Sequence, residues 1–297
     1  MAKNKKIEFG AINITTHPHS PEMYLKLFRA ARRLESSARL RGDQFGRIGL
    51  IKKLDDDQKE PGPIEGEILK FTDIDIEGEW FNVKSKSVAT EDDMADIYIP
   101  ENLKPNLSRF SFIFFPLEHI LIYEGYYDGK TLSPTLAETF FEKTLNHPAI
   151  KKKFGPVFVT HIPEANIIDR MLSLRGITNL TLTTKRPNPD DLRTTERKVH
   201  DRLKRWNASQ EERSLKAIDG DELHLDKELK LEAKVAAKNG IVELKHYNHE
   251  GVKETLSTKD HPMRRTEYYN PDSVLSFEIL REMAFNLKKE ISAWMKT

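Results

Sequence analysis

The chain of 297 residues contains no cysteine. Disulfide bonds, thiolate zinc sites and cysteine nucleophiles are therefore excluded, and nothing in the composition points to an oxidising compartment. No stretch approaches the roughly 18 to 20 consecutive apolar residues of a membrane-spanning helix. The opening residues, MAKNKKIEFG, lack the apolar region of a secretory signal. We therefore expect a soluble, cytoplasmic protein that does not enter a membrane.

Common catalytic motifs are also missing from the sequence. There is no G-x-S-x-G, P-loop, G-x-G-x-x-G or H-E-x-x-H. His17 and His19 flank a proline in a turn, and His246 and His249 would face opposite sides of a strand, so surface histidines explain these positions better than metal ligands. The sequence predicts neither a small-molecule cofactor nor a metal site.

What the sequence does contain is charge sorted into blocks. Apolar residues make up 38% of the chain, which is enough to form a core. The net charge is only +1, yet residues 1–54 carry +8, residues 55–101 carry −11, residues 102–213 carry +5 and the remainder carries −1. Blocks of one sign create local potentials that the total hides, so we expect separate basic and acidic surfaces.

The alternation of short strands and helices predicts an α+β fold of two mixed α/β halves, residues 1–148 and 149–297. Residues 157–184 read as strand, helix and strand with short links, which predicts a parallel pair joined by a right-handed crossover. A long amphipathic helix, residues 272–294, ends the chain. Its apolar positions have coiled-coil spacing and predict a homodimer contact or internal packing: Leu280, Ala284, Leu287, Ile291 and Trp294.

Each half contains a strand, a proline turn and a basic helix. In the first, residues 7–15 alternate as a strand, and Ser20 with Pro21 begins a helix that is predicted to end near Gly42. One side of this helix is apolar: Tyr24, Leu27, Ala31, Leu34 and Ala38. The opposite side carries Arg29, Arg32 and Arg33, which are candidate nucleic-acid-binding cations.

The second unit spans residues 176–206. Its strand ends before Pro187, and Asn188 with Pro189 is predicted to begin a helix. The apolar stripe of this helix is Leu192, Val199, Leu203 and Trp206. The candidate phosphate-binding cations are Lys185 and Arg186 beside the helix start, and Arg193, Arg197, Lys204 and Arg205 on its polar side.

The two units share a pattern at an offset of 168 residues. Thr15-Thr16 and Pro21 fall on Thr183-Thr184 and Pro189, and Arg29 falls on Arg197. Either two related units present similar basic helices, or similar helix starts arose independently. A solvated helix face is the plainer explanation of the cations, and nearby acids weaken the binding interpretation: Asp190, Asp191, Glu196 and Asp201.

Glu243 and Lys245 form an E-x-K on a predicted strand, as in nucleases that hold Mg²⁺ and position a water molecule. Such a site needs another acid on a neighbouring strand, for which Asp219 and Asp221 are the candidates. An E-x-K on an exposed strand also arises by chance.

Four stretches together resemble an uncharacterised bacterial family, a domain of unknown function, over nearly the whole chain: KRPNPDDL, GAINITTHPHSPEMY, PIEGEILKFTDID and IPENLKPNLSRFSFIFFP. That family supplies no activity. Residues 276–291, with Arg281-Glu282-Met283-Ala284, are similar to the last helix of the Rex exclusion protein A of phage lambda. This resemblance implies dimeric DNA binding in phage defence.

Three functions follow as hypotheses. The first is a non-catalytic nucleic-acid-binding protein, more suited to DNA than to RNA, that dimerises and acts in bacterial anti-phage defence. The second is a metal-dependent nuclease that uses Glu243 and Lys245. The third is a protein-interaction module in which the acidic residues 55–101 dock a basic partner or cover the basic helices of the same chain.

Overall fold

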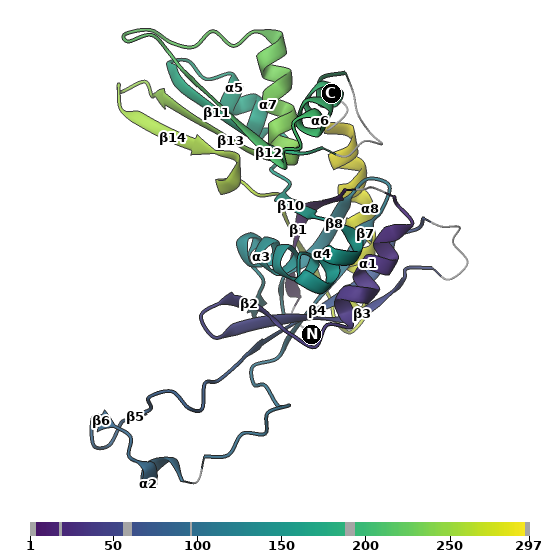
Figure 1. The fold of residues 1–297 in the computed structure, drawn as a ribbon, viewed down its shortest axis with the longest axis vertical. Coiled ribbons are helices and arrows are strands. Elements are labelled where there is room, and N and C mark those ends of the chain that lie inside the picture. The colour runs from purple at the N-terminus through teal and green to yellow at the C-terminus, as the bar shows by residue number, and fades with distance from the viewer. Residues whose placement is uncertain (1–3, 18–19, 56–60, 96, 188–193, 295–297) are drawn as a thin grey trace.

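The computed structural model describes residues 4–17, 20–55, 61–95, 97–187 and 194–294. These residues form a large sheet with helices on both faces, a smaller sheet with helices, and an arm that projects from the large sheet (Figure 1). The α+β class predicted from the sequence is confirmed.

The large sheet follows the order β10-β1-β8-β7-β4-β3-β2, while β15 also pairs with β1 and β9 with β8. All of its pairs are antiparallel. Its strands are β1 (Lys5–Thr16), β2 (Ala38–Arg41), β3 (Gln44–Lys53), β4 (Ile64–Thr72), β7 (Ser108–Phe115), β8 (Ile120–Tyr127), β9 (Lys130–Thr131), β10 (Val157–His161) and β15 (Arg264–Tyr269).

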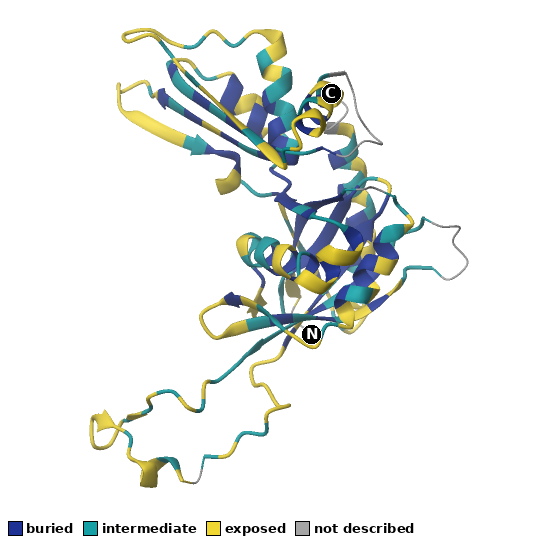
Figure 2. Ribbon diagram, viewed as in Figure 1, coloured by how far each residue is buried: buried dark blue, intermediate teal, exposed yellow. Residues whose placement is uncertain are grey.

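The centre of this sheet is buried on both faces (Figure 2). Phe112 and Phe114 of β7 pack into one core, beneath α1 (Met23–Arg32), α3 (Pro134–Leu145) and α4 (Pro148–Phe154). Ile113 and Phe115 point to the other face and pack into a second core with α8 (Ser276–Trp294). Burial on both sides explains why the last four residues of β7, residues 112–115, are all apolar.

The C-terminal helix α8 closes the second core. Leu280, Ala284, Leu287 and Ile291 are each at most 1% exposed and belong to that core. The predicted seam therefore packs inside its own chain, where a second copy cannot reach it. Among the described residues, none of the helices is both long enough and apolar enough to cross a membrane.

The smaller sheet has the order β12-β11-β13-β14 and is also antiparallel. Its apolar side packs on α5 and α7. The strands are β11 (Ile177–Lys185), β12 (Gln210–Lys216), β13 (Gly240–Tyr247) and β14 (Lys253–Ser257), and the helices of this part are α5 (Ile167–Leu172), α6 (Thr194–Arg205) and α7 (Lys227–Asn239). A 3-10 helix, Thr258–Asp260, follows β14.

The predicted parallel crossover is wrong. β10 joins the large sheet and β11 joins the small one, so α5 connects two sheets rather than two neighbouring strands. The division at residue 148 stays a prediction, but sheet membership does not follow it, because β10, β15 and α8 complete the large sheet and its cores.

The larger part of the acidic block, from residue 73 onwards, lies in an arm between β4 and β7, residues 73–107 (Figure 1). The arm contains nine acidic residues and three lysines. Its described elements are the short strands β5 (Phe81–Asn82) and β6 (Ser87–Val88) and the single-turn helix α2 (Glu91–Met94). The arm's two ends meet, since the Thr72 N–H donates to the Pro105 carbonyl over 2.9 Å.

Several helix boundaries differ from the sequence prediction. α1 begins at Met23 with Glu22 as its N-cap, not at Ser20 and Pro21, and α8 begins at Ser276, not at residue 272. α1 ends at Arg32, and Ala38 begins β2 instead of extending the helical stripe. Trp206 lies beyond α6 and is 61% exposed, whereas Val199 and Leu203 are buried as predicted. The predicted helix start at Asn188 and Pro189, together with Leu192 and Arg193, lies outside the described residues.

Candidate nucleic-acid interface

Helix α1 turns its cations to solvent because its other side is apolar. The residues buried beneath it are Tyr24, Leu25, Leu27, Phe28 and Ala31. Lys26, Arg29 and Arg33 are three and four residues apart, so they share the exposed side, where all three are solvent-accessible. Arg32 is also exposed, but its Nε donates to the Gly49 carbonyl over 2.8 Å, which directs it towards β3.

Helix α4 adds a second group of cations beside the first. Ile150 and Phe154 are buried in the core that also contains the apolar side of α1, and the two helices contact each other. The three residues between these anchors, Lys151, Lys152 and Lys153, are all exposed. Lys153 lies 5.4 Å from the ring centroid of Phe154.

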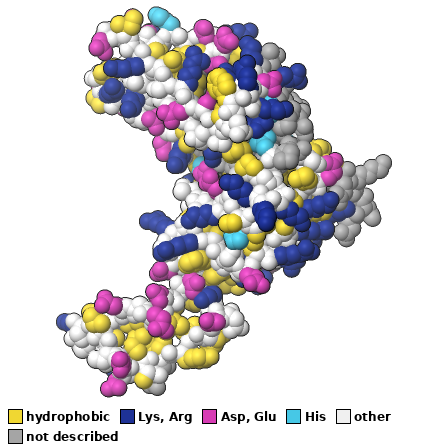
Figure 3. All heavy atoms as spheres, in the orientation of Figure 1, with side chains coloured by type: hydrophobic (Ala, Val, Ile, Leu, Met, Phe, Trp, Pro, Cys, Tyr) yellow, Lys and Arg dark blue, Asp and Glu magenta, His cyan; other side chains and the backbone are white. Residues whose placement is uncertain are grey.

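Together these helices form what we call the basic surface: Lys26, Arg29, Arg33, Lys151, Lys152 and Lys153. Across the described part of the chain, none of these cations lies within 4.0 Å of a carboxylate oxygen. Figure 3 shows Lys and Arg side chains gathered over α1 and α4 in the middle of the view. Six charges without carboxylate partners repel one another, and a phosphate backbone can neutralise them.

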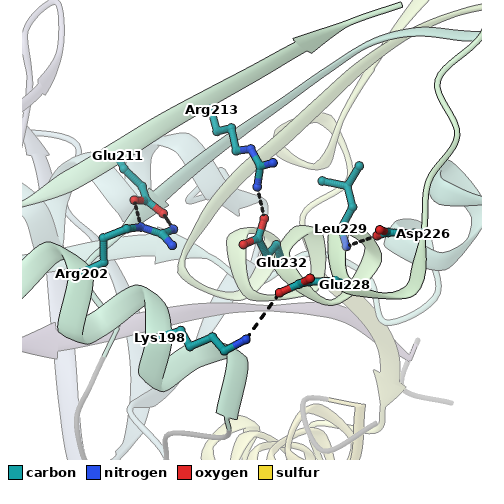
Figure 4. Close-up of polar contacts among 8 residues, drawn as sticks. All are labelled: Lys198, Arg202, Glu211, Arg213, Asp226, Glu228, Leu229 and Glu232. Atoms are coloured by element: carbon teal, nitrogen blue, oxygen red, sulfur yellow. Dashed lines mark hydrogen bonds and ion pairs between the residues drawn. The ribbon is translucent and has the colours of Figure 1, made fainter.

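Helix α6 carries cations with and without carboxylate partners, and Figure 4 shows the two that have partners, Lys198 and Arg202. Arg202 makes a bidentate contact with Glu211 of β12, and Lys198 lies 3.5 Å from Glu228 of α7, so these two cations join elements of the small sheet's layer. The Arg202–Glu211 contact raises the pKa of the guanidinium. Arg197, Lys204 and Arg205 are exposed and have no carboxylate partner among the described residues.

Lys185 and Arg186, predicted to bind phosphate beside the start of the second basic helix, do not form an exposed cationic surface. Both are only partly exposed. The Lys185 ammonium donates to the Val159 carbonyl over 2.9 Å, and therefore connects β11 to β10. The Arg186 carbonyl accepts a hydrogen bond from His17, and its buried Nε has no partner among the described residues. These two residues join the sheets.

The E-x-K does not acquire the neighbours that a nuclease site requires. Glu243 is exposed and Lys245 partly exposed, on the side of β13 opposite the buried Val242 and Leu244. The positions paired with Glu243 and Lys245 are Thr181, Asn179, Ser257 and Thr255, none of which is acidic. Asp219 and Asp221 follow β12, which does not neighbour β13.

One family model matches nearly the whole chain. The profile described as "Domain of unknown function (DUF4747)" matches residues 5–284. The chain belongs to this family. No curated protein matches it.

The match to DUF4747 begins at the first residue of β1 and ends within α8. It therefore includes both sheets, the arm and the basic surface. Because the family has no assigned activity, the site has to be judged by its geometry.

The sequence prediction named only part of the basic surface. Arg29 and Arg33 were among the predicted residues, whereas Lys26 and Lys151–Lys153 were not. The three consecutive lysines are visible in the sequence, but only the packing of α4 against α1 places them beside the arginines.

Proposed function

We propose that this DUF4747 protein is a non-catalytic nucleic-acid-binding protein, and that the basic surface on α1 and α4 is its principal contact. The observation that carries this proposal is the set of six exposed cations, none with a carboxylate partner among the described residues. Such cations bind phosphates by releasing condensed counterions, a mechanism that requires no base-specific contact. DNA is the preferred ligand, in line with the resemblance to the Rex exclusion protein.

The same resemblance supports a role in bacterial anti-phage defence, inside the cytoplasm. A homodimer is also part of that analogy and stays a prediction. If α8 contributes to it, the contact has to use the helix's outer side, since Leu280, Ala284, Leu287 and Ile291 are occupied by the core.

Fluorescence anisotropy with labelled duplex DNA, single-stranded DNA and RNA tests the proposal. We expect weak sequence preference and a log–log salt slope of roughly −5 on duplex DNA if each of the six cations neutralises one phosphate. Absence of binding at low salt would falsify the proposal. The same samples incubated with Mg²⁺ address the nuclease alternative, in which DNA is degraded and Lys245→Ala stops the degradation.

A second candidate function is protein binding through the acidic arm. The arm projects from the large sheet and exposes apolar side chains, among them Phe81 at 64%, Val83 at 76% and Tyr98 at 85%. Apolar groups surrounded by carboxylates suit a partner with a basic rim. Because Thr72 and Pro105 are hydrogen-bonded, residues 74–104 can be replaced by a short glycine–serine linker without separating β4 from β7.

That arm deletion separates the two candidates. If the basic surface is the functional site, the deletion leaves nucleic-acid affinity unchanged or raises it, because eight acidic side chains are removed from the protein. If the arm is the functional site, the deletion abolishes capture of a protein partner while the core remains folded.

A further inference from the structure

A cavity of about 250 Å³ opens beside the basic surface, between the end of α1, the start of β2, β3 and the end of α3. A single water molecule needs only roughly 15 Å³ of such space. Four cations line the cavity, Arg32, Arg39, Arg47 and Lys143, together with His147. No carboxylate is among the lining residues, and none of the four cations forms an ion pair with a described residue.

Backbone carbonyls hold the four cations in place. Nε of Arg39 donates to Gly42, Arg47 donates to Leu34, and the Lys143 ammonium donates to Arg39 over 2.8 Å. Arg32 is held by Gly49, as described above. A guanidinium has five N–H donors, so each arginine keeps several after this anchoring bond. Anchored donors lose little conformational freedom when they bind a ligand.

Neutral donors complete the lining. Thr144 is 6% exposed, and its Oγ1 has no hydrogen-bond partner among the described residues. Ser36 and Ser37 contribute hydroxyls. His147 accepts the Ala149 N–H at Nδ1, which leaves Nε2 as the donor in the neutral ring. A buried hydroxyl without a hydrogen-bond partner carries a free-energy cost.

A donor-rich cavity without carboxylates fits an anion, and the number of cations favours a dianion. A phosphate monoester carries a charge of about −1.5 to −2 at neutral pH, whereas a backbone phosphodiester carries only one charge. The cavity begins where α1 ends, and His147 is also the N-cap of α4, so it adjoins the basic surface.

We propose that this cavity binds a phosphate monoester, namely the terminal phosphate of a nucleic-acid strand that lies on the basic surface. The phosphate pocket itself stands on its own lining residues; only the strand end as the source of the phosphate rests on the proposed function. The cations and hydroxyls surround the phosphate oxygens, and the remaining volume accommodates the attached nucleoside.

Two measurements test this pocket. The first compares the affinities of oligonucleotides with phosphate and hydroxyl ends, each end in turn. We expect the phosphate end to bind about tenfold more tightly, the difference that one or two charge-assisted hydrogen bonds produce. The second measures thermal unfolding with inorganic phosphate against chloride at equal ionic strength, and we expect phosphate to raise the Tm.

The decisive variant is Arg39→Gln with Lys143→Gln, which should remove both effects. Arg39→Lys keeps the positive charge but loses the planar, forked donors of the guanidinium. It should therefore weaken the preference for phosphate ends only in part. Arg41→Gln is the matched control, because Arg41 is an exposed arginine of the same strand that does not line the cavity. It should retain both effects.

The outcomes separate the pocket from the basic surface. If strands with phosphate and hydroxyl ends bind equally and phosphate does not raise the Tm, the proposal of a phosphate pocket is wrong, while the proposed function stands. If phosphate raises the Tm of the wild type but not of the double variant, the pocket is correct even when no strand binds, and its phosphate then comes from a free phosphorylated compound. If the preference for phosphate ends or the rise in Tm persists in the double variant, the proposal of a phosphate pocket is overturned.

Discussion

Nε2 of His17 donates a hydrogen bond to the backbone carbonyl of Arg186 over 3.2 Å, and this contact joins the ends of the two central strands. His17 directly follows β1, and Arg186 directly follows β11. The ring of His17 also lies 6.2 Å from that of His200 on α6, centroid to centroid. The two units whose sequence patterns match at an offset of 168 residues therefore contact each other just after β1 and β11 end.

The basic surface gives the first prediction. Arg29→Glu with Lys152→Glu should lower DNA affinity by roughly tenfold or more at low salt. It should also reduce the log–log salt slope by the amount that about two phosphate contacts contribute. Both side chains are exposed, so the Tm should hardly change. Lys84→Glu with Lys86→Glu on the arm makes the same change in net charge and is the control. Equal loss from both double variants would mean that net charge alone, and not this surface, sets the affinity.

The second prediction concerns α6. Arg197→Glu with Lys204→Glu removes two exposed cations that have no carboxylate partner in the described structure. If α6 contributes to the same contact, this double variant weakens binding and flattens the salt dependence as the α1–α4 variant does. A salt slope identical to that of the wild type would restrict the nucleic-acid interface to α1 and α4.

Lys185 provides the third prediction, and it is a structural one. Its partly exposed ammonium donates to the Val159 carbonyl. Lys185→Met should therefore lower the free energy of unfolding by about 1.5 to 3 kcal/mol, the usual range for a lost hydrogen bond with one charged partner. Denaturant unfolding measures this change. The salt slope of DNA binding should remain that of the wild type. A lower slope would show that Lys185 does contact a phosphate.

The fourth prediction is a pH dependence. Glu124 is 2% exposed, and burial raises the pKa of its carboxyl to about 7, although the Ser111 N–H donates to it. The unfolded chain releases this proton near the ordinary value of 4.5. Between these two values the folded state holds more protons, so stability falls as the pH rises from about 4.5 to 7.

Glu124→Gln should remove that dependence. The variant should be more stable than the wild type at pH 8, by on the order of 3 kcal/mol, and nearly equal to it at pH 4.5. Urea unfolding across this range measures the difference. Parallel pH profiles for the two proteins would show that Glu124 titrates normally.

The fifth prediction addresses the C-terminal helix. Leu287 is 1% exposed in the core beneath α8, so Leu287→Ala should cost about 2 to 5 kcal/mol of stability. The same change should leave the oligomeric state, measured by light scattering, as it is in the wild type. Conversion of a dimer to a well-folded monomer would show that the seam is an intermolecular contact after all.

Much of the fold was predictable because local patterns match local structure. The alternation in residues 7–15 and 177–184 became β1 and β11, and the helical stripe at Tyr24, Leu27 and Ala31 became buried. Strand pairing was not predictable in the same way. Nothing in residues 157–184 indicates that β10 and β11 enter different sheets, because pairing depends on partners far away in the sequence, such as His161 opposite Ile12.

The candidate site shows the same division. Exposure of Arg29 and Arg197 followed from helical periodicity, whereas the role of Lys185 depended on the Val159 carbonyl, which a sequence pattern cannot place. The seam of α8 has the spacing of a coiled coil, but the same spacing suits packing on a sheet, so only the position of β7 and β8 decides between them.

By itself, the sequence determined the α+β class, the separation of charge and the solvent-facing side of α1, because these depend on composition and on periods of two and 3.6 residues. The tertiary structure alone decided which cations become neighbours. Lys151–Lys153 lie far from Arg29 along the chain, and the packing of α4 against α1 brings the two groups together. It likewise collected Arg32, Arg39, Arg47 and Lys143 around one cavity, since side chains from four separate elements converge only when the sheet is formed.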